Sequence, residues 1–302
     1  MSETQGVLIL AGSTASGKTE LAIELAREFD AEIVGADSRQ VYRDMPVGTA
    51  APSPEQLAAV PHHLIGFLDP RERYSAARFA SDALEAIAAI ERRGKRAIVV
   101  GCTGFYIRAL TGGVALSPQY DEALRRRLAR EARLHPPEFL HAWLQQRDPA
   151  RAAKLHAGDT YRVVRALEIA LAAPTGGDEI LARTLGDVGL SPLTIFLDLP
   201  WNTIDRRIAE RTEQMLEAGF VAEAERAGDA AAANALGYPQ AVAYLRGWNT
   251  QAELRASLER STRRYARRQR AWFRGEPSTL WLAPDRVAAA VREKLGWPSK
   301  AR

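Results

Sequence analysis

One stretch near the amino terminus constrains this chain more than any other, and it reads Gly12-Ser13-Thr14-Ala15-Ser16-Gly17-Lys18-Thr19. It fits the phosphate-loop pattern G-x-x-x-x-G-K-[ST], follows the apolar run at 7–11 and precedes an amphipathic segment at 20–29. A strand, a glycine-rich loop and a helix in this order aim successive N–H groups and the helix dipole at one anion. We therefore expect all eight residues to bind a diphosphate or polyphosphate, with Lys18 adding charge and the Thr19 hydroxyl placed to hold Mg²⁺.

Length and composition set the outer limits of the fold. The 302 residues leave room for about two domains, or for one domain with an insertion. The single cysteine, Cys102, cannot form an internal disulfide, which suits a reducing compartment. No apolar run approaches the ~20 residues that span a bilayer, and residues 1–5 do not resemble a signal peptide. We expect a cytoplasmic protein with no membrane contact.

The order of apolar and amphipathic segments predicts an α/β protein with a P-loop NTPase-like core, in which helices flank a parallel sheet. Further strands are expected at 32–36, 97–100, 193–198 and 278–282, and further helices at 76–93, 202–218, 251–273 and the carboxyl terminus. Residues 45–61 read as a loop.

The middle of the chain differs in character. Residues 118–185 show helical periodicity at 124–134, 139–144 and 161–171, no convincing strand, and a looped end at 174–177. We therefore expect an all-helical insertion at 118–185, between a first part of the core at 1–117 and a second part at 186–302.

Asp37 follows the second expected strand and should lie near the bound phosphates, because ligands of open parallel sheets sit beyond the carboxyl ends of the strands. Its position leaves three roles open: a magnesium ligand, a general base, or a helix N-cap without catalytic importance. Thr103 is the only hydroxyl in the turn after the 97–100 strand and is expected to touch substrate. His62 and His63 point to opposite sides of an extended segment and are expected to serve packing rather than zinc binding.

The expected helix at 251–273 carries a dense positive charge. Residues 260–275 contain seven arginines and no acid, so a net charge of +4 for the whole chain leaves about −3 elsewhere, since 4 − 7 = −3. Arg263, Arg267 and Arg270 lie on one stripe at helical spacing. Guanidinium groups suit phosphate, so we expect a nucleic-acid backbone as partner, although arginines paired with the protein's own acids are the alternative. Tyr265, Gln269 and Trp272 share a face, where the aromatic side chains are expected to pack on the core.

Several stretches together resemble the tRNA dimethylallyltransferase family, also called the tRNA isopentenyltransferases. They are the phosphate loop; Asp37-Ser38-x-Gln40-x-Tyr42 with Gly48-Thr49; Pro61-His62-His63; Gly101-x-Thr103-Gly104-x-Tyr106; Asp159-x-x-Arg162-x-x-Arg165 with Glu168; Arg211 with Met215 and Gly219; Gly237-Tyr238; and 262–269 with Trp272-Phe273-Arg274. Each motif apart from the phosphate loop is weak alone, but the ordered set covers nearly the whole chain.

The resemblance implies transfer of a dimethylallyl group from dimethylallyl diphosphate to N6 of the adenosine at tRNA position 37, with release of diphosphate and dependence on Mg²⁺. It implies that Asp37 is the general base and that Ser38, Arg39, Gln40 and Thr103 lie near the flipped adenosine. It places Lys18, Thr19 and Arg211 on the diphosphate and magnesium side of a catalytic site to which Thr103 also belongs. It makes Arg162 and Arg165, together with Arg263, Arg267 and Arg270, contacts of the tRNA anticodon stem-loop, and we expect a monomer.

The sequence departs from the family pattern at five places. Ser13 replaces a proline, Cys102 a glycine, Phe105 a leucine and Gly158 an asparagine, and Pro174-Thr175-Gly176-Gly177 replaces the usual loop after the arginine helix. Three other functions also stay open. A small-molecule kinase that uses ATP would explain the phosphate loop and Asp37 but leaves the arginines without a purpose. A nucleotide-switched RNA-binding protein and a prenyltransferase of free adenine nucleotides are the others.

Overall fold

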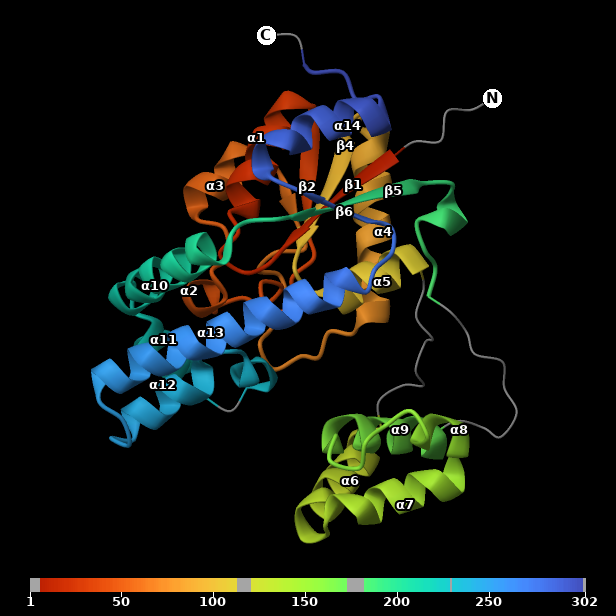
Figure 1. Ribbon diagram of the computed structural model, residues 1–302, viewed down its shortest axis with the longest axis vertical. Coiled ribbons are helices and arrows are strands. Elements are labelled where there is room, and N and C mark those ends of the chain that lie inside the picture. Colours follow the sequence, from red (N-terminus) through yellow and green to blue (C-terminus); the bar gives the residue numbers. More distant parts are fainter. Residues whose placement is uncertain (1–5, 113–120, 173–181, 229, 301–302) are drawn as a thin grey trace. The chain divides into compact units, whose positions relative to one another are not determined.

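A parallel sheet forms the centre of the fold (Figure 1). The computed structural model describes residues 6–112, 121–172, 182–228 and 230–300. Within these ranges the sheet has six strands in the order β3-β2-β4-β1-β5-β6, and every neighbouring pair is parallel. The strands are β1 (Gly6–Gly12), β2 (Ala31–Gly35), β3 (His62–His63), β4 (Arg96–Gly101), β5 (Ser191–Leu197) and β6 (Thr279–Leu282). The predicted α/β class is confirmed.

Both faces of the sheet are covered, which explains why its central strands are continuous apolar runs. Successive side chains of a strand point to opposite faces. In β1, Val7, Ile9 and Ala11 pack with α4 (Ala76–Arg92) and α5 (Gly104–Gly112), whereas Leu8 and Leu10 pack with helices on the other face. Those helices are α1 (Lys18–Glu28), α10 (Trp201–Glu217) and α14 (Val287–Leu295).

The long helix α13 (Gln251–Arg274) lies beside α10 and α12 (Tyr238–Leu245) (Figure 1). Thr250 and Glu253 form a capping box at its amino end. The remaining elements of this part are α11 (Phe220–Ala227), η1 (Gly186–Val188), η2 (Ala231–Asn234) and η3 (Pro284–Arg286). No helix among the described residues is long and apolar enough to cross a membrane.

The prediction of a loop at 45–61 is wrong, because two short helices form there: α2 (Pro46–Thr49) and α3 (Pro54–Ala59). Proline is well tolerated at the first position of a helix, and Ser53 and Gln56 form a capping box at α3. The local signal was therefore present in Ser53-Pro54-Glu55-Gln56, but the many prolines and small residues obscured it.

The helical segment in the middle of the chain forms a compact unit, residues 115–181, separate from the unit that holds the sheet. Its described helices are α6 (Glu122–Leu134), α7 (Pro137–Arg147), α8 (Pro149–Ala152) and α9 (Thr160–Ala172). They enclose a small core of their own, which includes Leu128, Leu144 and Leu167. The predicted boundary at 118 and the loop at 174–177 lie outside the described residues. Ala182 and Leu185 are buried in the core beside the sheet, so the sheet-containing unit resumes at 182.

A buried carboxylate ties the short helix α2 to the carboxyl-terminal half of the chain. Glu223 on α11 is 1% exposed and accepts the N–H groups of Val47 at 2.8 Å and Gly48 at 2.7 Å. It also accepts the Tyr238 hydroxyl at 2.8 Å. These N–H groups belong to the first turn of α2 and have no partner within the helix, so Glu223 stabilises that helix end.

We expect Glu223→Gln to lower the free energy of unfolding by about 1.5–3 kcal/mol, because an amide cannot accept all three hydrogen bonds and charge-assisted bonds are the stronger kind. Urea denaturation measures the change. Tyr238→Phe is the matched control, since it removes one donor only and should cost about 0.5–1.5 kcal/mol. A Glu223→Gln protein as stable as the unmodified one would contradict this role.

Candidate active site

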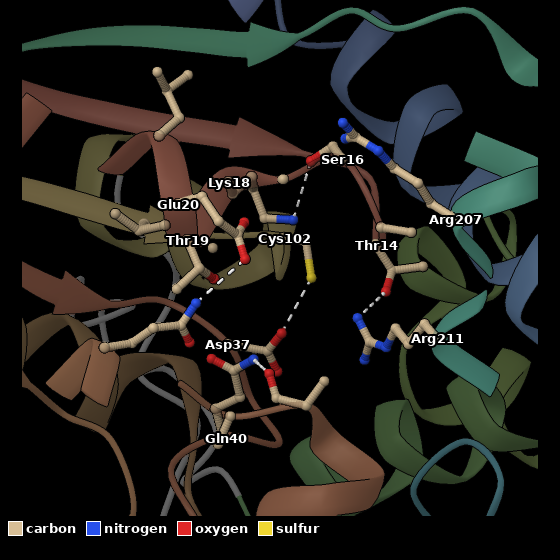
Figure 2. Close-up of a pocket in the computed structure, with 18 of the residues that line it drawn as sticks. Thr14, Ser16, Lys18, Thr19, Glu20, Asp37, Gln40, Cys102, Arg207 and Arg211 are labelled. Atoms are coloured by element: carbon tan, nitrogen blue, oxygen red, sulfur yellow. Dashed lines mark hydrogen bonds between the residues drawn. The ribbon is translucent and has the colours of Figure 1, made fainter. Parts of the chain in front are cut away.

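The carboxyl ends of β1, β2 and β4 meet at one edge of the sheet and bring three polar segments together (Figure 2). β1 runs into the phosphate loop, β2 into Asp37, and β4 into Gly101 and Cys102. A Cβ atom on Gly101 would lie only 2.1 Å from the carbonyl oxygen of Ala36. Glycine is therefore required at 101, and it lets Asp37 and Cys102 become neighbours.

The phosphate loop has the backbone expected for an anion site. Ala15 and Gly17 adopt φ angles of +63° and +81°, and α1 starts directly afterwards at Lys18. The first N–H groups of α1 have no acceptor within the helix and face out of its positive end. The Lys18 ammonium donates to the carbonyl of Ser13 at 2.8 Å, and burial lowers the pKa of this lysine.

Asp37 does not begin a helix; it directly precedes a turn at residues 38–41. Its Oδ1 accepts the N–H of Arg39 at 2.9 Å, and its Oδ2 accepts the Cys102 thiol at 3.2 Å. Of the three roles left open by the sequence, the helix N-cap is therefore wrong. Each carboxylate oxygen keeps a second lone pair for another proton.

Two arginines of α10 line the same space (Figure 2). Arg211 donates to the Thr14 hydroxyl at 3.1 Å, and burial lowers its pKa. Arg207 lies one helical turn earlier and was missed by the sequence analysis, although its spacing of four from Arg211 places both on one helix face. Burial disfavours the charged forms of Lys18 and Arg211, and a bound anion would offset that cost.

Two cavities open on the site. The first has a volume of about 640 Å³ and is lined by the phosphate loop, Gln40 and the two arginines. The second has a volume of about 450 Å³ and is lined by Ser38 and Arg39, by Met215 and Leu236, and by α13. They share five lining residues, Thr14, Asp37, Thr49, Cys102 and Arg211. Asp37 and Arg211 therefore stand where the two cavities meet.

Two side chains that are predicted to contact substrate, Gln40 and Thr103, form hydrogen bonds with the protein's own backbone. The Gln40 amide donates to the carbonyls of Thr49 at 3.2 Å and Ala50 at 2.8 Å. The Thr103 hydroxyl accepts the N–H of Ser38 at 2.9 Å, and Thr103 does not line either cavity. Both side chains position the loop that carries Asp37, while their contact with substrate stays a prediction.

The arginines of α13 divide into two groups. Arg270 is 17% exposed at its side chain and contacts Asp198 at 2.5 Å, and Arg263 contacts Glu259 at 2.9 Å and Asp205 at 3.3 Å. The other group, which we call the exposed arginines, has no carboxylate partner among the described residues: Arg260, Arg264, Arg267, Arg268 and Arg274. The alternative of internal pairing therefore holds for Arg263 and Arg270.

The two arginines predicted in the insertion also differ. Arg162 on α9 is 69% exposed and lies 3.3 Å from Asp159. Arg165 is 22% exposed and contacts the buried Glu168 at 2.7 Å, with Arg125 on the other carboxylate oxygen at 3.4 Å. Arg162 is thus the more accessible of the two, and their contact with tRNA stays a prediction.

Tyr265 is a further site residue, which the sequence pattern did not reveal as one. Tyr265 lines the second cavity from α13, and the guanidinium of Arg268 lies 5.6 Å from its ring centroid. The Cys102 thiol, burial and Asp37 raise the pKa of its phenol, so the hydroxyl keeps its proton. Helical periodicity placed Tyr265 on a core-facing side, but that signal cannot distinguish a packed residue from one that lines a cavity.

The fold and the site define an α/β protein in which a cavity at the glycine-rich loop adjoins a second cavity at a carboxylate. The IPP transferase family matches residues 40–276, and the isopentenyl transferase family matches residues 5–71. The chain therefore belongs to the IPP transferase family.

Named relatives match over most of their length. A tRNA dimethylallyltransferase of Geobacter sulfurreducens is 43% identical and covers 91% of each chain, and one of Anaeromyxobacter dehalogenans is 44% identical and covers 96% of this chain and 98% of the relative. Among solved structures, the tRNA isopentenylpyrophosphate transferase of Bacillus halodurans has a TM-score of 0.68 and 32% identity, with 97% of each chain covered.

Cys102 should be nearly inert in the folded protein, because burial raises the pKa of its thiol to about 12. At pH 8 this leaves a thiolate fraction roughly a thousandfold below that of a thiol with an ordinary pKa near 9. We expect an aromatic disulfide reagent to react with the native protein at least a hundredfold more slowly than with the urea-unfolded chain. Comparable rates would show that Cys102 is open to solvent.

Proposed function

We propose that this enzyme transfers a dimethylallyl group from dimethylallyl diphosphate to N6 of the adenosine 3′ of the anticodon, at tRNA position 37. The observation that carries the proposal is the meeting of two cavities at Asp37 and Arg211. Family membership supports the reaction, and the kinase alternative is not favoured, because the matching relatives are named tRNA dimethylallyltransferases.

The first cavity would hold the diphosphate. Its phosphate loop, Lys18 and Arg211 surround the position where negative charge grows as the allylic C–O bond breaks. The electron pair of that bond leaves with the diphosphate, and the prenyl carbon becomes cation-like. The cations and N–H groups lower the barrier because they are already in place before the charge develops.

Asp37 would act as the general base. The exocyclic amine of adenine is a weak nucleophile, and it gains from a carboxylate that accepts its proton as the new N–C bond forms. A base stacked in an RNA loop is out of reach, so the adenosine would be flipped into the second cavity beside Ser38 and Arg39. The reaction then leaves the N6-dimethylallyl adenosine, the protonated Asp37 and free diphosphate.

Magnesium is proposed to bind beside the diphosphate. Thr19 lines the first cavity and is the protein residue that would hold the ion, together with substrate oxygens. No group of three His, Cys, Asp or Glu side chains that could hold a metal alone exists among the described residues. When bound, the ion would neutralise part of the diphosphate charge. A cytoplasmic location and a monomeric state stay predictions.

Asp37→Ala should leave RNA binding within about threefold and reduce transfer by at least the ~10² typical of a lost general base. Single-turnover assays with labelled donor measure the rate, and filter binding measures the affinity. Glu85→Gln, which removes an exposed carboxylate on α4, is the control and should change neither quantity. Near-normal transfer by Asp37→Ala would exclude Asp37 as the base.

Arg267→Gln and Arg270→Gln form a matched pair that tests where RNA lies on α13. Arg267 is exposed, with Trp201 5.7 Å from its guanidinium, so its loss should reduce the slope of log affinity against log salt by about one. Arg270 forms an ion pair with Asp198, so its loss should destabilise the fold and leave the slope of log affinity against log salt unchanged. The reverse pattern in the two variants would show that RNA does not use the exposed arginines.

A further inference from the structure

One face of α13 touches three parts of the site in succession. Leu258, Thr262 and Tyr265 line the second cavity, and Gln269, one turn further along, reaches the phosphate loop. Trp272 follows and packs against Gly104. A Cβ atom on residue 104 would lie only 2.1 Å from the indole nitrogen of Trp272, so only glycine fits there. A single rigid helix therefore joins the second cavity to the loop that would bind the diphosphate.

The link to the phosphate loop is a buried hydrogen bond between residues 255 positions apart. The N–H of Thr14 donates to Oε1 of Gln269 at 2.8 Å, and Gln269 is only 5% exposed. The Thr14 hydroxyl meanwhile accepts from Arg211. Thr14 is thus held by Gln269 of α13 at its backbone N–H and by Arg211 of α10 at its side-chain hydroxyl.

That bond acts beside a strained residue. Ala15 follows Thr14 directly and has a φ angle of +63°, a left-handed conformation that is unfavourable for an L-residue with a side chain. Strained backbone persists only where its surroundings hold it in place. Gln269 accepts the N–H of the Ser13–Thr14 peptide, whose carbonyl accepts from Lys18, so a shift of α13 would act directly on the geometry of the phosphate loop.

The amide of Gln269 also contacts a residue of the second cavity. A side-chain hydrogen bond with Gln269 lowers the pKa of the Tyr265 phenol, against the groups that raise it. Tyr265 lines the second cavity, so one amide contacts both a wall of that cavity and the phosphate loop. An apolar side chain at 269 would leave the buried N–H of Thr14 without its acceptor.

We propose that Gln269 is a positioning residue that couples RNA bound at α13 and the second cavity to the phosphate loop, so that RNA and diphosphate strengthen each other's binding. The proposal rests on the proposed function. RNA on the exposed arginines and in the second cavity fixes α13, Gln269 fixes the Thr14 peptide, and the loop is then preorganised for the anion. Coupling is reciprocal, so diphosphate strengthens RNA binding by the same factor.

The test measures binding of inorganic diphosphate, with Mg²⁺, in the presence and absence of an unmodified anticodon stem-loop RNA. Diphosphate is the product and the RNA is unreacted, so no chemistry interferes. We expect the RNA to tighten diphosphate binding in the unmodified protein by roughly 5–150-fold, the usual range of coupling between sites. In Gln269→Met, which keeps length and volume but loses the acceptor, the factor should fall below about threefold with RNA affinity retained.

Gln240→Met is the matched control, because Gln240 donates to Ser261 on α13 at 3.1 Å but does not contact the phosphate loop. It should keep the full coupling factor. If Gln269→Met fails to fold, Gln269→Asn serves instead, since its shorter side chain cannot reach Thr14.

Three outcomes would overturn the proposal. Equal coupling in the unmodified protein and Gln269→Met would overturn the role of Gln269 alone. A factor of one in the unmodified protein, with both ligands bound, would show that the two sites are independent. Absence of RNA binding by the unmodified protein would overturn the proposed function and this inference with it.

Discussion

The contact between Gly101 and the carbonyl of Ala36 is the constraint on which the rest of the site depends. Neighbouring parallel strands end at the same edge, but side chains normally keep the segments beyond them apart. The absence of a side chain at Gly101 lets the chain after β2 stay close to β4, where the N–H of Ala36 donates to the carbonyl of Val100 at 2.7 Å. Cys102 then reaches Asp37, and the Thr103 hydroxyl accepts the N–H of Ser38. The geometry of the carboxylate is thus fixed by backbone packing.

The charges around Asp37 suit an anion, and the second cavity differs from them in character. Lys18 and Arg211 are partly buried near each other and Asp37, and burial lowers the pKa of both cations. Such an arrangement is poorly suited to stability and well suited to an anion that arrives with its own negative charge. The second cavity instead has apolar walls formed by residues such as Met215 and Leu236, which suit a flat base.

The sequence predicted most of the core, because phosphate-loop spacing and apolar runs are local signals. The strands that carry the loop, Asp37 and Cys102 all follow from such patterns, and the family is confirmed by the relatives that match. The short helices α2 and α3 and the lining role of Tyr265 were missed. The ion pair between Asp198 and Arg270 could not be predicted either, because the two residues are 72 positions apart and only the fold brings them together. Periodicity tells which residues share a face, but not what lies opposite that face.

The most direct test of the central claim is to incubate the purified protein with unmodified tRNA, labelled dimethylallyl diphosphate and Mg²⁺, and to analyse the nucleosides after digestion. The account predicts label in N6-dimethylallyl adenosine from position 37, with one diphosphate released for each nucleoside modified. Diphosphate release without labelled RNA, or ATP turnover with a small-molecule acceptor, would contradict it.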